Sequence, residues 1–203
     1  IRVGANNNTI VYNSIKIMSI GGRTIMSFIN DNFMLKNETA KLLYNKYAKD
    51  MPIVDYHCHI SPREIYEDKR FDSITELWLG GDHYKWRLIR SNGVSEEEIT
   101  GNADPKTKFI RFAEALSKSI GNPMYHWTHL ELKRYFGYDG ILNADTAEEV
   151  YELCNKKLRE PEMSARGIIN ASNVKMIGTT DDPIDSLEWH IKLAADKSFK
   201  TRV

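Results

Sequence analysis

The sequence predicts an α/β fold, and three observations support that prediction. A short segment rich in β-branched and aromatic residues, 52–60, has the composition of a strand. A second apolar segment, 173–178, leads through a polar tip into a helix-forming stretch. Between them, about a hundred residues place apolar side chains at helical three- and four-residue spacings. Two strands cannot close a sheet, so we expect the N-terminal part of an α/β barrel, whose complete form has eight strands and about 250 residues.

Composition narrows the class of ligand. Lys plus Arg and Asp plus Glu both number 28, so no net field attracts nucleic acid or an anionic membrane, and we expect neither as a partner. Cys58 and Cys154 are too few for a disulfide framework, which indicates a reducing compartment and, by default, the cytoplasm. No apolar run approaches the roughly 18 residues of a spanning helix. We therefore expect a soluble protein that holds a small molecule through local groups.

Residues 1–25 differ in composition from the rest of the chain. They contain basic residues, no acidic residue and a cluster of asparagines. The apolar run in this segment is interrupted by Asn, Ser and Lys and precedes no small-residue cleavage site, which argues against a signal peptide. We predict that 1–25 is a translated or non-native leader and that the natural start is Met26. Residues 26–203 would then be a truncated barrel domain with a helical insertion at 61–160.

The first helix is expected shortly before the first strand. Apolar side chains from Ala40 to Tyr47 recur on one helical face, and Asn37 is a suitable N-cap. The helix should end just before Pro52, because proline disfavours α-helical geometry at the residue that precedes it. The segment that follows, 52–60, is expected to be a buried strand that ends at a functional loop.

The tract between the two strands divides into helices with recognisable ends. Ser61 precedes a proline at a helix start, and Gly93 and Gly121 stop two later helices, the second of which is expected to bury Ile120. After the second strand, a last helix should begin at Pro183 and pack back against that strand. The helices of the tract are expected within 61–70, 73–79, 82–93, 104–121, 124–137 and 146–160.

The most specific chemical feature is His57-Cys58-His59 at the end of the first strand. Residues two apart on a strand point to the same side, so both imidazoles can aim at one point while Cys58 points away. Two neutral imidazole nitrogens there are suitable ligands for a divalent metal ion. A polar strand tip without a metal is the alternative. The adjoining Ser-Pro helix start favours the metal, because α/β barrels place functional groups at that end of their strands.

A second candidate group is His83, Tyr84 and Arg87, which begin a helix after two glycines. Together these side chains can reach a ligand carboxylate or hydroxyl, and the glycines give the preceding loop its conformational freedom. The alternative is a capped surface helix whose Tyr84 serves only in packing. The residue types by themselves do not distinguish a binding role from a packing role.

The polar tip after the second strand holds Asp181 and Asp182. One of them is expected to cap the helix at Pro183, since Asp before a proline is favourable at a helix start. The other can face the mouth of the barrel, and we assign Asp182 to substrate binding.

The remaining histidines are weaker candidates. His126 and His129 lie three residues apart on one helical face, a spacing that permits metal ligation, but their aromatic neighbours favour a core or capping role. His190 is isolated on an amphipathic helix, and its sequence context predicts no role.

Four segments of the chain, taken in order, resemble a known family. They read DNFMLKNETAKLLYNKYAKDMPIVDYHCHISPREIYEDKRF, GGDHYKWRLIRSNGV, IGNPMYHWTHLELKRYFG and SARGIINASNVKMIGTTDDPIDSLEWH. They are similar to the start of uronate (glucuronate) isomerases, which belong to the amidohydrolase-like superfamily of metal-dependent barrels. The similarity extends from Met26 to Val203 and leaves out residues 1–25.

The resemblance implies a (β/α)8 barrel whose first strand ends in a metal-binding pair, matching His57 and His59, with zinc or a similar ion. It also associates Tyr84 and His83 with the sugar, so we expect Tyr84 in catalysis and His83 and Arg87 in substrate binding. Family members interconvert D-glucuronate and D-fructuronate, and D-galacturonate and D-tagaturonate, through an enediol. The family's later-strand aspartate and carboxylate-binding arginines have no counterpart here, so we expect the chain alone to be inactive.

Two other functions stay open on the sequence. A metal-dependent hydrolase of the same superfamily also begins with such a histidine pair, and a non-catalytic helical module would fit the long helical tract. The physiological metal, the preferred uronate, the base that removes the C2 proton and any homo-oligomer of the full-length protein are likewise undetermined by the sequence.

Overall fold

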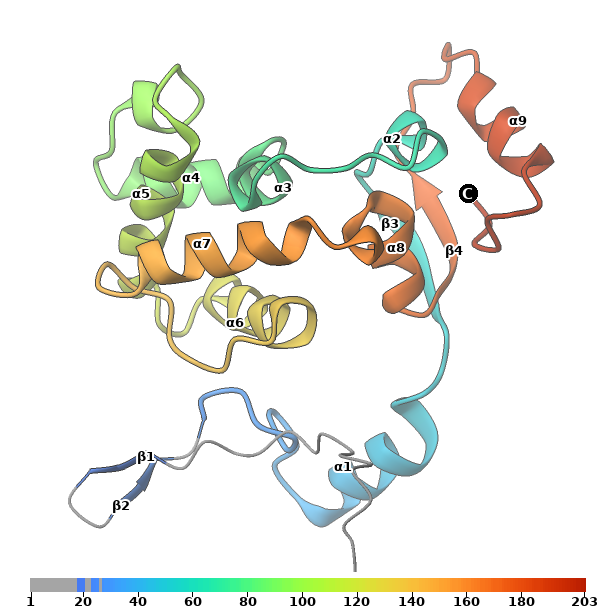
Figure 1. Cartoon of the computed structure of the whole chain (residues 1–203). Helices are drawn as coiled ribbons and strands as arrows, with labels where there is room; N and C mark the ends of the chain where they lie inside the picture. Colours follow the sequence, from blue (N-terminus) through green and yellow to red (C-terminus); the bar gives the residue numbers. More distant parts are fainter. Residues whose placement is uncertain (1–17, 21–22, 26) are drawn as a thin grey trace, which may run out of the picture.

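The computed structural model describes residues 18–20, 23–25 and 27–203 and has an α/β architecture (Figure 1). The leader predicted at 1–25 lies outside the described residues except for β1 and β2, which pair antiparallel. The strands are β1 (Met18–Ile20), β2 (Arg23–Ile25), β3 (Ile53–Cys58) and β4 (Val174–Thr179). The α-helices are α1 (Glu38–Leu43), α2 (Pro62–Tyr66), α3 (Ile74–Leu79), α4 (His83–Ser91), α5 (Pro105–Ser117), α6 (Pro123–Phe136), α7 (Ala147–Leu158), α8 (Ala165–Ala171) and α9 (Glu188–Ala195).

β3 and β4 form a two-stranded parallel sheet and occupy the two segments predicted to be strands. The helical tract from α2 to α8 connects them, as parallel strands require a long crossover. Asp55 pairs with Ile177 and Cys58 pairs with Thr179, but the register shifts between these pairs, so β3 carries one extra residue there. Because the strands are parallel, their C-terminal ends lie at the same edge of the sheet.

The prediction that the first strand is buried is wrong for one of its faces. Val54 and Tyr56 are 55% and 86% exposed. A parallel sheet normally has both faces covered, whereas in the described part of the chain helices cover only one face of this sheet. The covered face contributes to a small core with α2, α8 and α9, made of Cys58, Ile65, Ile169, Ile177, Leu193 and Phe199.

A larger core lies within the helical group α3 to α7. Its most deeply buried side chains include Phe109, Phe112, Leu116 and Leu132. Asp104 caps α5 by accepting a hydrogen bond from the Thr107 amide, and Gly137 ends α6 with a φ of 69°. α5 ends earlier than predicted, since serine hydroxyls bond back to its last carbonyl groups, and Ile120 is exposed instead of buried. No helix in the described residues is long and apolar enough to span a membrane.

α1 begins as predicted, but its apolar face is not buried. The Asn37 side chain accepts a hydrogen bond from the Ala40 amide at 2.8 Å and caps the helix. The helix continues through a π-helical turn, Tyr44–Ala48. Leu43 and Tyr47 are 54% and 60% exposed, and no residue of α1 is buried. An amphipathic pattern therefore predicted the helix here without predicting its packing.

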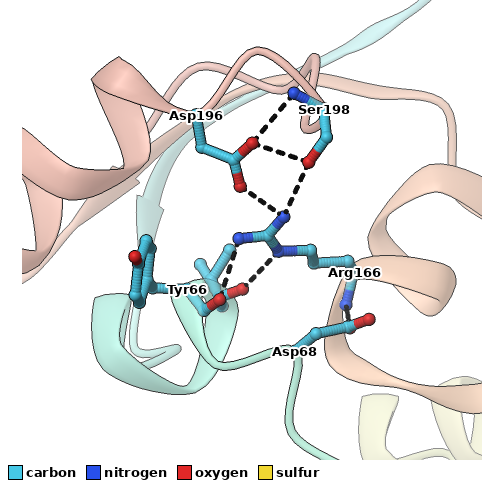
Figure 2. Close-up of polar contacts among 6 residues, drawn as sticks. Tyr66, Asp68, Arg166, Asp196 and Ser198 are labelled. Atoms are coloured by element: carbon cyan, nitrogen blue, oxygen red, sulfur yellow. Dashed lines mark hydrogen bonds and ion pairs between the residues drawn. The ribbon is translucent and has the colours of Figure 1, made fainter.

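Arg166 in α8 ties together the helices that follow the two strands (Figure 2). Its guanidinium group donates to the carbonyl oxygens of Ile65 and Tyr66 at the end of α2, at 2.7 and 2.8 Å, and to Asp196 Oδ2 after α9, at 2.7 Å. The hydroxyl and amide of Ser198, together with Arg166, lower the pKa of Asp196 to about 2. Because folding lowers this carboxyl pKa, its stabilising effect is complete above the ordinary value of 3.8 and is lost as the pH falls from there through about 2.

Replacing Arg166 with methionine should lower the free energy of unfolding by about 3 kcal/mol, because the carbonyl groups at the end of α2 lose charged donors. Urea unfolding at neutral pH measures this change. The control is Arg63→Met, which breaks a surface ion pair with Glu67 whose side chains are 62% and 46% exposed and should change stability little. Equal losses in the two variants would show that Arg166 contributes no more than an ordinary surface pair.

Candidate functional site

His57 and His59 lie side by side at the C-terminal end of β3. Their ring centroids are 5.0 Å apart and the ring planes are nearly perpendicular, at 88°. Both residues are exposed, whereas Cys58 between them is buried against the helices, as alternation along a strand predicts. Burial raises the pKa of the Cys58 thiol, which keeps it protonated and poorly suited to bind a metal. The two imidazoles are therefore the groups at this strand end that can bind a ligand.

The described residues bring together two imidazoles of the kind that a divalent metal ion would need as ligands. A catalytic zinc site typically has three protein ligands and one open position. Within residues 18–20, 23–25 and 27–203, no group of three or more His, Cys, Asp or Glu side chains could hold a metal ion. The exposed imidazole pair fits part of such a centre, and any further protein ligand would have to come from outside this set.

The tip of β4 forms a polar cluster with His190 of α9. Thr179 Oγ1 lies 2.8 Å from His190 Nε2, and the Thr179 hydroxyl also donates to the carboxylate of Asp181. Asp181 Oδ2 lies 3.5 Å from the same His190 nitrogen. The only sequence signal for His190 is that it lies on the helix that returns to β4. A pocket of about 340 Å³ adjoins the cluster, and its lining includes Ser61, Arg63, Asp185, Glu188 and Trp189.

Asp182 closes a turn beyond this cluster. Its Oδ1 accepts a hydrogen bond from the Ile184 amide at 3.1 Å. The prediction that a helix begins at Pro183 is wrong: Leu187 has a left-handed φ of 54°, and α9 begins at the residue after it. The helix cap expected from one aspartate is therefore wrong as well, because Asp182 closes a turn instead, while its assignment to substrate binding stays a prediction.

His83, Tyr84 and Arg87 lie together on an exposed side of α4. Tyr84 is 70% exposed, and the Arg87 guanidinium lies 5.7 Å from its ring. The His83 ring packs edge-on against Trp86, with 4.7 Å between ring centroids. α4 belongs to the helical group and lies apart from β3, the strand at whose end the histidine pair is found (Figure 1). Among the described residues, no hydrogen bond or ring contact joins the two sets.

The start of α4 is anchored from its buried side. Asp82 Oδ1 accepts from the amides of Tyr84 and Lys85 at 2.9 and 3.0 Å, and Oδ2 lies 3.0 Å from the buried Lys85 ammonium. Although burial opposes ionisation of Asp82, the Lys85 charge and these amide bonds lower its pKa. Trp86 Nε1 donates to the Leu79 carbonyl at 2.6 Å. These contacts fix the conformation of the turn from which the Tyr84 side chain projects.

His129 is a structural residue, as predicted. Its Nδ1 lies 2.7 Å from the Tyr125 carbonyl, and its Nε2 accepts a hydrogen bond from the Leu142 amide at 3.0 Å. The neutral ring with its proton on Nδ1 satisfies both backbone groups. Since both nitrogens are engaged, His129 does not join His126 as a metal ligand.

Stability should fall as the pH drops below about 6.5, the ordinary pKa of histidine, because burial lowers the pKa of His129 in the folded state. The unfolded chain then binds more protons than the folded chain, which favours unfolding at low pH. We expect His129→Gln to be less stable at neutral pH but to lose less stability on acidification, as measured by urea unfolding. The matched control is the half-buried neighbour, His126→Gln, which should keep most of the wild-type pH dependence, because burial of His129 is the largest cause of its lowered pKa and the His126 charge is a smaller one. An unchanged profile for His129→Gln would contradict this account.

Comparison with known proteins extends over nearly all of the described chain. The sequence model of the family described as glucuronate isomerase matches residues 25–203. Uronate isomerases of Lachnoclostridium phytofermentans and Lachnospira eligens are each 60% identical over 176 residues, covering 87% of this chain and 38% of theirs. The crystal structure of uronate isomerase from Thermotoga maritima matches with a TM-score of 0.80 and 39% identity, over 86% of this chain and 38% of that one. Glucuronate isomerase from Caulobacter crescentus matches with a TM-score of 0.72 and 25% identity, over 79% and 36%.

Proposed function

Since the chain belongs to the glucuronate isomerase family, we propose that it supplies the first strands and part of the active site of an enzyme that isomerises hexuronates. The reactions are D-glucuronate to D-fructuronate and D-galacturonate to D-tagaturonate. The chain spans 38% of the length of the curated relatives, so the activity is proposed for a protein of their length. The paired imidazoles of His57 and His59, inside the region that matches the family, carry this proposal.

In that protein, β3 and β4 would be two neighbouring strands of a (β/α)8 barrel, with the tract at 61–160 as an insertion. The parallel pairing of the strands and the helices on one face support this arrangement. The exposed face that carries Val54 and Tyr56 would become the interior of the barrel, which side chains normally fill. The free thiols Cys58 and Cys154 are consistent with a cytoplasmic enzyme.

His57 and His59 would hold a divalent metal ion, which we propose to be zinc, through neutral ring nitrogens. When bound, such an ion supplies Lewis-acid stabilisation of negative charge on the substrate's oxygens. The two histidines also contribute orientation, because His57 lies in β3, His59 directly follows that strand, and their rings are close together. A site on a rigid strand end preserves its geometry better than one on a mobile loop.

The sugar would be positioned by the side chains on α4. Aldose–ketose conversion moves a proton between C2 and C1 through an enediol, and negative charge develops on oxygen along the way. The Tyr84 hydroxyl is suited to donate a hydrogen bond to that oxygen. Arg87 and His83 provide donors beside it, with the Arg87 guanidinium suited to a carboxylate. Asp182, in the turn that follows β4, is a further proposed substrate-binding residue.

The proposal is tested by joining residues 26–203 to the remaining C-terminal part of a curated relative, which gives a protein that we call the fused enzyme. With zinc and D-glucuronate, the fused enzyme should form ketose at a rate comparable to that relative. Residues 26–203 alone should show no measurable turnover, since two imidazoles are only part of a metal's ligand shell. A fused enzyme that folds and binds zinc but forms no ketose would overturn the proposal.

A further inference from the structure

The backbone between the two histidines is held by the neighbouring strand. The Thr180 hydroxyl donates to the carbonyl oxygen of Cys58 at 3.0 Å, just beyond Cys58↔Thr179, the last register pair of the sheet. This carbonyl belongs to the peptide that joins Cys58 to His59, so its orientation directs the His59 side chain. Thr180 thus adds a side-chain bond where the ladder of backbone bonds ends.

β4 also constrains the backbone of β3 at Tyr56 and His57, where β3 carries its extra residue. A Cβ atom on Gly178 would lie 2.7 Å from the Tyr56 carbonyl oxygen, so the two backbones approach more closely there than any other residue would allow. Bulges of this kind redirect side chains and are frequent beside functional sites. Both histidines are therefore directed by contacts with the end of β4.

The end of β4 is itself held on its other side by His190. The Thr179 hydroxyl has a single proton, and it donates that proton to Asp181. The contact between Thr179 Oγ1 and His190 Nε2, at 2.8 Å, therefore requires Nε2 to carry the proton and donate it. The His190 side chain is only 20% exposed, and α9 is tied to the core through Leu193. Two hydrogen bonds on adjacent residues of the β4 tip, one from His190 to Thr179 and one from Thr180 to the Cys58 carbonyl, thus link α9 to the backbone between the two histidines.

We infer that Thr180 and His190 are positioning residues that orient the His57 and His59 imidazoles for metal binding, acting through the Cys58 carbonyl and the tip of β4. The inference rests on the metal-binding role proposed above for the histidine pair. Neither positioning residue needs to touch the metal or the substrate. Residues that orient metal ligands in this way typically contribute about 10- to 100-fold in metal affinity.

The test is a zinc titration of the 203-residue chain followed by the NMR signals of the His57 and His59 rings. Thr180→Val, which keeps the shape but removes the hydroxyl, should bind zinc at least about tenfold more weakly, and so should His190→Leu. Thr180→Ser and His190→Gln restore a donor and should stay within about twofold of wild type. The matched control is Thr201→Val, because the buried Thr201 hydroxyl donates to the Val174 carbonyl at 2.7 Å at the opposite end of the same strand.

Equal weakening in Thr201→Val and Thr180→Val would show a general loss of sheet stability and would overturn the inference. A second measurement needs no metal: the ring-to-ring nuclear Overhauser effect between His57 and His59, whose centroids are 5.0 Å apart, should be lost in Thr180→Val. Its persistence in that variant would also overturn the inference. If the wild-type chain binds no zinc but Thr180→Val loses this signal, the metal assignment fails and the positioning role stands.

Discussion

Alanine in place of His57 or His59 is expected to remove zinc from the fused enzyme and to lower its turnover by more than about 10³-fold. The basis is that both imidazoles leave β3 on one side, with ring centroids 5.0 Å apart, while the described residues offer no third ligand to compensate. Loss of one preorganised donor to a developing oxyanion already costs about 10²- to 10³-fold in turnover, and loss of the ion removes a larger charge. Metal content by atomic spectroscopy and turnover of D-glucuronate should fall together.

Cys58→Ala is the matched control for this experiment, because Cys58 lies between the two histidines but faces the helical core. It removes a small buried side chain, so it should lower stability modestly and leave zinc content unchanged. If both histidine variants kept full zinc content, or if Cys58→Ala lost as much zinc as they did, the assignment of the imidazoles as ligands would be wrong.

Tyr84→Phe is expected to lower the turnover of the fused enzyme by about 10²-fold or more while KM changes far less. The hydroxyl is proposed to bond to an oxygen whose negative charge is greatest in the transition state, so its removal affects turnover more than substrate binding. Tyr84 is 70% exposed, and its backbone is held by the Asp82 cap, so the loss of one hydroxyl should leave folding and zinc content unchanged. Steady-state kinetics with D-glucuronate provide the measurement.

Tyr47→Phe is the control for Tyr84→Phe, since Tyr47 is also exposed, at 60%, but lies on the π-helical turn before the sheet. It should have wild-type kinetics. Unchanged turnover in Tyr84→Phe would show that the Tyr84 hydroxyl takes no part in catalysis. Tyr84 would then serve only in packing, the alternative that the sequence also allows for a residue at the start of a surface helix.

Local signals in the sequence predicted the positions of most elements. The apolar segments at 52–60 and 173–178 are β3 and β4, and Asn37 and Asp104 cap the helices that their neighbours predicted. Gly137 ends α6 because a left-handed residue there satisfies the last carbonyl groups. These features depend on residues no more than about four positions apart, so they can be read without knowing the fold.

Burial and the start of α9 could not be predicted in the same way. Leu43 and Tyr47 have the spacing of a buried helical face and are exposed, because burial requires another element to pack on them. The strand β3 has the composition of a doubly covered strand, yet only one of its faces is covered among the described residues. The helix expected to begin at Pro183 begins instead at Glu188, because Asp182 closes a turn in the segment between them.

For the candidate site, the sequence by itself determined that His57 and His59 share one side of a strand and that Cys58 faces the other, because alternation is a local property of extended backbone. Only the tertiary structure decided that His190 contacts the tip of β4 and that Thr180 bonds to the Cys58 carbonyl. The Thr180 contact joins segments that the parallel crossover brings to one edge of the sheet, whereas the His190 contact depends on how α9 folds back on the strand that precedes it. Residues about a hundred positions apart meet there because of how strands pair, which no local spacing encodes.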